Sequence, residues 1–200
     1  MSTYDEAIFK FMTEPNNFEA MLKVREHWDR VRRKLLVEFW TLVRDKLIEL
    51  VQKDGREEEW IVQANLNYPD KYQAITLVKN TWEKLSPENW VPISVTWSDI
   101  FRQAIYGVWL DAKSQYWELN AIREKARIIS VEVKMDYDHA WWPAFYAPPE
   151  ANFAVERNLT QLLPENRDSH AQEYARILWE DIAKPYESLL DDLYQLKKQP

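Results

Sequence analysis

The residues best suited to chemistry lie late in the chain, in a stretch whose alternating pattern predicts a strand. Glu132 and Lys134 stand two positions apart there, which places both side chains on the polar face of that strand. Two carboxylates that hold Mg²⁺ or Mn²⁺ beside a lysine can activate a water molecule for attack on a phosphodiester. Asp111 would supply the second carboxylate, with Asp70 as the more distant alternative. Charge pairing on a solvated sheet face explains the same pattern without any metal.

A second group of candidate ligands follows this strand directly. Asp136, Asp138 and His139 form the sequence Asp-Tyr-Asp-His, and alternate carboxylates beside an imidazole can bind a divalent ion. A polar turn, in which the aspartates bond the local backbone, explains the cluster more simply. We therefore predict a turn here, with a metal site as the alternative.

An aromatic segment comes next and suggests binding rather than catalysis. It contains Trp141, Trp142, Phe145 and Tyr146, interrupted by Pro143. Successive tryptophans beside a proline cannot all turn inward, so part of this apolar surface is expected to contact a partner. Most other large aromatic residues are expected in the core, where burial of each one is worth several kcal/mol at about 25 cal/mol per Å².

The elements that must position these residues begin with a long helix. From Phe18 to Gly55 the apolar residues recur at steps of three and four, which places them on one face of a helix of roughly 35 residues. Gly55 suits the position just after the helix. A helix of this length needs cover along its apolar face, either from a sheet or from another chain.

Short runs rich in valine, isoleucine, threonine and aromatic residues then predict strands. They span residues 60–66, 74–79, 91–97, 105–110 and 128–135. Helices are expected at 114–127, 153–162 and 169–197, the last bent at Pro185. The predicted fold class is α+β: an antiparallel sheet of about five strands, packed by the long N-terminal helix and followed by C-terminal helices. We expect one domain over residues 1–200, with a helical arm (1–55), a sheet region (56–138) and an aromatic segment with C-terminal helices (139–200).

Composition narrows the function classes. The 200 residues include no cysteine and only two glycines, which excludes thiolate metal sites and glycine-rich phosphate loops. The net charge of −7 is unlike that of a general nucleic-acid binder, although a local basic patch would still permit such binding. No stretch is apolar and long enough to span a membrane, and the first residues do not resemble a secretory signal. A cytoplasmic protein is expected.

Five segments in order along the chain resemble one known family. They are Leu35–Val43, Val91–Trp97, Ile105–Trp109, Trp141–Tyr146 and Ile182–Tyr186. This order resembles the C-terminal, non-catalytic region of bacterial and phage PD-(D/E)XK nuclease-superfamily proteins. The resemblance covers most of the chain from about residue 18 onward and implies an accessory domain without the nuclease core.

We therefore expect a non-enzymatic accessory or protein-interaction domain. A protein partner is expected at the segment Trp141–Tyr146, and a homodimer through the long helix is a further expectation. One alternative is a nuclease that uses Glu132, Lys134 and Asp111 with Mg²⁺ or Mn²⁺, the one case in which a cofactor is expected. The other is an acidic phage inhibitor of a host nucleic-acid-handling protein. No membrane partner is expected.

Overall fold

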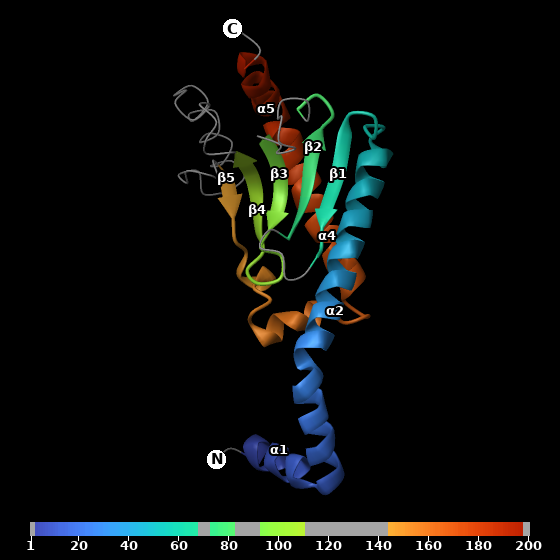
Figure 1. The fold of residues 1–200 in the computed structure, drawn as a ribbon, viewed down its shortest axis with the longest axis vertical. Helices are drawn as coiled ribbons and strands as arrows, with labels where there is room; N and C mark the ends of the chain where they lie inside the picture. Colours follow the sequence, from blue (N-terminus) through green and yellow to red (C-terminus); the bar gives the residue numbers. More distant parts are fainter. Residues whose placement is uncertain (1–2, 68–72, 83–92, 111–143, 198–200) are drawn as a thin grey trace. The chain divides into compact units, whose positions relative to one another are not determined.

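A computed structural model describes residues 3–67, 73–82, 93–110 and 144–197 (Figure 1). The chain divides into two compact units, Met1–Leu36 and Val37–Pro200, which are described separately. The helix expected at 114–127 and the strand expected at 128–135 lie outside the described residues. The prediction of a single domain stays a prediction.

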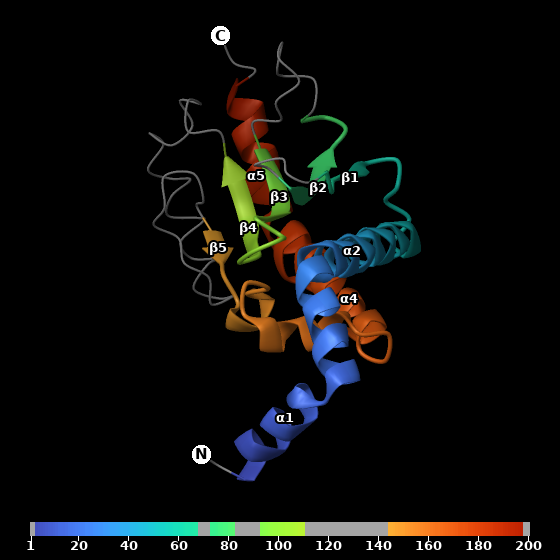
Figure 2. The same cartoon turned by 60° about the horizontal axis from the view of Figure 1, so that its bottom comes forward.

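The first unit consists of helix α1 (Thr3–Thr13) and the first part of helix α2 (Pro15–Lys53). The sequence analysis did not predict α1. The two helices are separate because Pro15 has no N–H to donate to the carbonyl oxygen of Phe11. The side-chain amide of Asn17 donates to that oxygen instead, at 3.0 Å. Figure 2 shows α1 leaving the start of α2 at an angle rather than continuing its axis.

Helix α2 confirms the long predicted helix, and its end is built as the sequence predicts. Gly55 has a φ of 68°, a left-handed conformation that costs little in glycine. Its N–H donates to the carbonyl oxygen of Gln52 at 2.9 Å, and the N–H of Arg56 donates to that of Val51 at 3.1 Å. These two bonds form a Schellman motif, which satisfies carbonyl groups at the helix end and stops the helix there.

The second unit contains a five-stranded antiparallel sheet, which confirms the predicted α+β class. Its strands are β1 (Trp60–Asn65), β2 (Ala74–Lys79), β3 (Ile93–Ser98), β4 (Ile105–Leu110) and β5 (Ala144–Tyr146), and they pair in chain order. The first four match predicted strands. The sequence does not predict β5, which lies within the aromatic segment and pairs with β4 (Figure 1).

The register of the sheet places aromatic side chains on one face. Trp97 pairs with Tyr106, and Tyr106 pairs with Tyr146, so the three rings lie side by side across β3, β4 and β5. Thr96, a polar residue between the apolar Val95 and Trp97 of β3, is only 5% exposed. Its hydroxyl is satisfied by the carbonyl oxygen of Ile75 at 3.0 Å and lies 3.1 Å from the hydroxyl of Thr76. A polar strand position is therefore compatible with burial when its hydrogen bonds are made.

The C-terminal residues form a series of helical segments, of which the later ones lie behind the sheet (Figure 1). Two short 3₁₀ helices, Pro149–Ala151 and Glu156–Leu162, stand where one helix was expected. Then come α4 (Arg167–Arg176), the π-helical segment η5 (Ile177–Ala183) and α5 (Lys184–Lys197). The π-helical turns stand directly before Pro185, which has no N–H for the regular α-helical bond, and the N–H of Lys184 donates to Trp179. The sequence predicted a bend at this proline, and the structure shows the wider π turns.

The core of the second unit lies where α2 meets the sheet and α4. The rings of Trp97 and Tyr174 stack with centroids 4.9 Å apart, and Trp40 lies 5.5 Å from Trp97. Both indole N–H groups are satisfied: Trp40 donates to the carbonyl oxygen of Ile100 at 2.7 Å, and Trp97 donates to that of Tyr174 at 3.1 Å. The prediction that Trp97 belongs to the core is confirmed.

Candidate interaction surfaces

Most of the predicted site residues lie outside the described part of the chain. These are Asp70, Asp111, Glu132, Lys134, Asp136, Asp138, His139, Trp141 and Trp142. The nuclease hypothesis and the metal-binding alternative therefore stay predictions. Within the described ranges, no three His, Asp or Glu side chains gather closely enough to hold a metal ion.

Two residues of the aromatic segment are described, and they do not lie on the same face. Phe145 and Tyr146 are consecutive in β5, so their side chains point to opposite sides of the sheet. Tyr146 is 38% exposed, and its ring lies 5.8 Å from that of Tyr106. Burial raises the pKa of Tyr106 to about 12. Tyr146 thus lies at the outer end of a row of aromatic rings that leads into the core, and part of its side chain is exposed to solvent.

A half-buried charged cluster, which the sequence did not predict, joins α5 to β2 and to the end of α2. Glu187 of α5 accepts hydrogen bonds from Arg56 at 2.5 and 2.6 Å, and its carboxylate lies 2.5 Å from the ammonium group of Lys79. Lys79 also donates to Asp191 at 2.6 Å. The pKa of Glu187 falls to about 2, chiefly through the hydrogen bonds from Arg56, while burial opposes the change.

Tryptophan rings surround this charged cluster. The ammonium group of Lys79 lies 5.7 Å from the centroid of Trp60 and 5.8 Å from that of Trp82. The indole N–H of Trp82 donates to Asp191 at 3.0 Å. Burial opposes the ionisation of Lys79, but the hydrogen bonds to Asp191 and Glu187 raise its pKa. Each cation of the cluster has a carboxylate partner, so the cluster holds the second unit together and leaves little uncompensated charge for a ligand.

A smaller ion pair, again beside a tryptophan ring, joins the end of α2 to the π-helical segment. Lys184 lies 2.5 Å from Asp54, and the indole N–H of Trp179 donates to the same carboxylate at 2.8 Å. These hydrogen bonds, the one from Lys184 above all, lower the pKa of Asp54. Asp54 and Lys184 are far apart in sequence, so no local sequence pattern predicts their contact.

The first unit has a different surface, rich in exposed apolar side chains. Seven of the ten exposed large hydrophobic residues in the described ranges belong to Met1–Leu36. They are Ile8, Phe9, Phe11, Phe18, Leu22, Val24 and Val31. Phe9 and Phe11 are the most exposed, at 64% and 63%. Such a concentration of apolar side chains is typical of an interaction surface.

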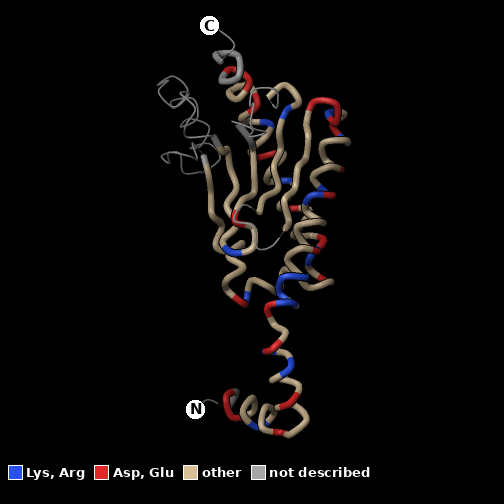
Figure 3. The backbone as a smooth tube through the Cα atoms, in the orientation of Figure 1, with Lys and Arg blue, Asp and Glu red and all other residues tan. Residues whose placement is uncertain are grey.

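Charge is unevenly distributed in the same unit. The first turn of α1 carries Asp5 and Glu6, whereas residues 30–34 of α2 include four basic side chains, Arg30, Arg32, Arg33 and Lys34 (Figure 3). At the start of α2, Lys23 and Glu19 form an ion pair at 2.7 Å, and both side chains are about two-thirds exposed. The unit therefore presents an acidic region and a basic region on separate helices.

No protein-family model matches the chain, and neither a curated protein nor a solved structure matches it. The resemblance to PD-(D/E)XK nuclease-superfamily proteins therefore stays a prediction. Among the described residues, no helix is long and apolar enough to cross a membrane.

Proposed function

We propose that this chain is a protein-interaction domain, in which the second unit is a rigid scaffold and the first unit carries the contact surface. The observation behind the proposal is the apolar exposure of α1 and of the start of α2, where Phe9, Phe11 and Val24 are each more than half exposed. Exposed apolar area on this scale costs free energy in water and is recovered when a partner covers it.

The packing of the second unit supports the scaffold role. Its largest aromatic side chains, among them Trp40, Trp97 and Trp179, are fully buried. The charged cluster around Glu187 adds ties between elements that are distant in sequence. A unit held in this way keeps its shape while its neighbour binds.

The cellular setting is a further part of the proposal. We place the domain in the cytoplasm of a bacterium or a phage-infected cell, as an accessory to a nucleic-acid-handling protein. The resemblance of segments such as Ile105–Trp109 and Ile182–Tyr186 to the nuclease superfamily supports this setting, and so does the absence of cysteine from the sequence.

Site-specific photo-cross-linking tests the contact surface. The full chain is produced with benzoylphenylalanine in place of Phe11 and, in a matched control, in place of Val155, an exposed apolar residue of the second unit. On irradiation in cells, the probe at position 11 is expected to yield a discrete protein adduct, and the probe at position 155 is not. Equal yields from both positions, or no adduct from position 11, would contradict the proposed function.

A further inference from the structure

Helix α1 carries a wide apolar face, and its polar side chains Thr3, Glu6, Lys10 and Thr13 recur at steps of three and four on the opposite face. Lys10 is the only polar residue between Ala7 and Met12. Phe9 and Phe11 stand two positions apart, so they point about 200° apart around the helix, and both are more than 60% exposed. The apolar face of a helix normally packs against a neighbouring element. The exposure of both rings therefore calls for a partner across the whole width of this apolar face.

Helix α2 offers a surface of the matching shape. Met21, Val24, Trp28, Val31 and Leu35 recur at alternating steps of three and four, the spacing that receives a second helix along a seam. Val24 is 59% exposed and Val31 is 47% exposed. We call these five residues the α2 seam. Within it Val24 and Val31 are exposed, and Met21, Trp28 and Leu35 are half-buried.

The charges beside the α2 seam determine which helix suits it. Arg25 and Arg32 border the seam on one side, and His27 and Lys34 border it on the other. Two α2 seams packed against each other would bring these basic borders together, which is unfavourable. An acidic helix is favoured instead, and α1 carries Asp5 and Glu6 in its first turn (Figure 3).

The geometry points to a second copy of this chain as the occupant. We propose that two copies associate reciprocally, with α1 of each copy lying along the α2 seam of the other. This inference rests on the proposed function and names its partner. The α1 of the same chain leaves Val24 and Val31 exposed. A foreign helix on the seam would leave Phe9 and Phe11 uncovered, whereas reciprocal exchange covers both surfaces under one two-fold axis.

The exposed area is of the size that such a dimer needs. Phe9, Phe11 and Phe18 together leave roughly 350 Å² exposed, if a large aromatic side chain offers about 200 Å². A stable interface buries about 800 Å² on each partner. The exposed aliphatic side chains of both helices and the stems of the bordering arginines supply the remainder.

Sedimentation of the full chain tests the association. The wild type is expected to sediment with about twice the 24.1 kDa mass of one chain. Val24→Glu places a charge in the α2 seam and is expected to weaken dimerisation at least tenfold. Val155→Glu makes the same change at an exposed valine of the second unit and should leave the dimer intact. Far-ultraviolet circular dichroism confirms that both variants keep the wild-type helix content.

A charge exchange tests the reciprocal arrangement. One variant carries Asp5→Lys and Glu6→Lys, and the other carries Arg25→Glu and Lys34→Glu. At low ionic strength each variant alone is expected to be mainly monomeric, because like charges then meet at both contacts. Their mixture restores opposite charges at both contacts and is expected to form a mixed dimer. A mixture that stays monomeric, or single variants that dimerise as the wild type does, would overturn the arrangement.

The remaining outcomes separate this inference from the proposed function. A monomeric wild type whose probe at position 11 cross-links a different protein overturns the second copy as partner and keeps the interaction domain. A monomeric wild type that forms no adduct, but co-sediments with phosphatidylcholine vesicles, overturns both in favour of a lipid surface. Adducts between two copies of the chain, with a dimeric mass, support both.

Discussion

The two parts of α2 carry the same kind of apolar pattern in different environments. Val24 and Val31, in the first unit, are 59% and 47% exposed. Val43 and Val51, in the second unit, are 0% and 2% exposed. Both parts thus place valines at a helical spacing, seven residues apart in the first unit and eight in the second. The periodicity of a sequence therefore predicts which face of a helix is apolar, but it does not predict whether anything in the same chain covers that face.

This difference assigns separate roles to the two units. Burial of apolar area stabilises the second unit, and its half-buried ion pairs add ties between distant segments. The first unit gains little from packing within its own chain, because its phenylalanine side chains Phe9, Phe11 and Phe18 lie exposed. Variants with the same chemical change in each unit test this division of roles.

The largest expected difference in stability is between phenylalanine-to-alanine substitutions in the two units. Phe39→Ala removes a fully buried ring that contacts Trp40 and Tyr174 edge to face, and we expect a loss of about 3–5 kcal/mol in the free energy of unfolding. Phe11→Ala removes a ring that is 63% exposed and is expected to cost less than about 1 kcal/mol. Urea unfolding, followed by tryptophan fluorescence in dilute solution, measures both. Similar losses for the two variants would contradict the division between the units.

The charged cluster predicts a pH dependence confined to the second unit. The pKa of Glu187 is lowered to about 2, so its contribution is complete above the unfolded value near 4.5 and is lost as the pH falls from there toward 2. Glu187→Gln is expected to lower the free energy of unfolding by about 1–2 kcal/mol at pH 7, after allowance for solvent screening. It should also flatten the acid limb of the stability curve, that is, the fall in stability as the pH drops below the unfolded pKa of this carboxyl group. Thermal unfolding between pH 7 and pH 2 measures the effect.

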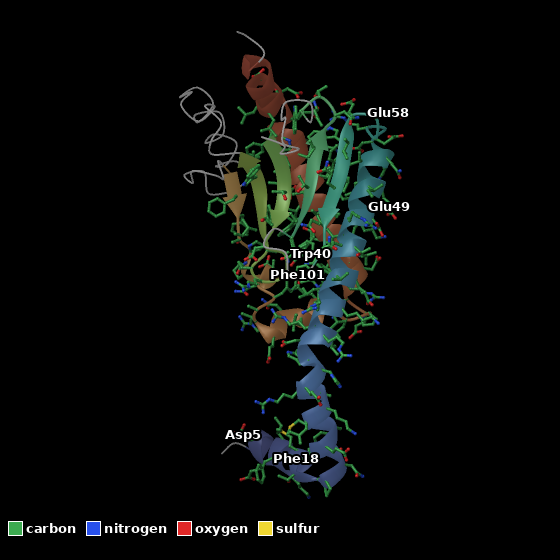
Figure 4. All side chains as sticks on the ribbon, viewed as in Figure 1. Asp5, Phe18, Trp40, Glu49, Glu58 and Phe101 are labelled. Atoms are coloured by element: carbon green, nitrogen blue, oxygen red, sulfur yellow. The ribbon has the colours of Figure 1, made fainter. Side chains whose placement is uncertain are left out.

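A matched control distinguishes the cluster from a general acid effect. Glu58 is an exposed glutamate in the turn before β1, and Figure 4 shows it at the surface. Glu58→Gln should leave both the stability at pH 7 and the slope of the acid limb as in the wild type. If Glu58→Gln flattens the acid limb as strongly as Glu187→Gln does, the cluster is not its source.

Local patterns were sufficient for the parts of the fold that local physics determines. Helix α2 and its glycine end follow from apolar periodicity and from the φ that Gly55 adopts, and β1 to β4 follow from alternation and turn residues. Helix α1 was not predicted, although Thr3, Glu6, Lys10 and Thr13 recur at steps of three and four and mark one polar face of a short helix. Strand β5 is only three residues long and exists through its pairing with β4.

The sites depend on contacts that no local pattern encodes. Arg56 and Glu187 lie 131 positions apart and meet only after the second unit has folded. The exposure of Val24 is likewise a property of the folded chain, since the same spacing produces buried valines further along α2. The predicted dimer through the long helix was a reasonable hypothesis from length alone. The exposed seam and its basic borders now give that hypothesis specific residues to test.

An intermediate effect is expected at the point where α2 ends. Gly55→Ala places a Cβ in a left-handed conformation and should cost about 1 kcal/mol, since the surroundings are open and the cost is conformational. Gly55→Asn should cost about half as much, because asparagine tolerates this region better. Because the next residue is Arg56, the loss should appear in the unfolding of the second unit. Equal stability of all three proteins would mean that the Schellman motif does not hold the helix end.

The smallest effect is expected from an ion pair of the first unit. Glu19 and Lys23 lie one helical turn apart at 2.7 Å, but both side chains are about two-thirds exposed. Solvent screening and side-chain entropy leave such a pair worth about 0.3–0.5 kcal/mol. Glu19→Gln, measured by urea unfolding beside Glu187→Gln, should therefore change stability several-fold less, and 1 M salt should abolish the small difference that remains. A loss as large as that of Glu187→Gln would show that the first unit has buried electrostatic ties of its own, which its exposed side chains contradict.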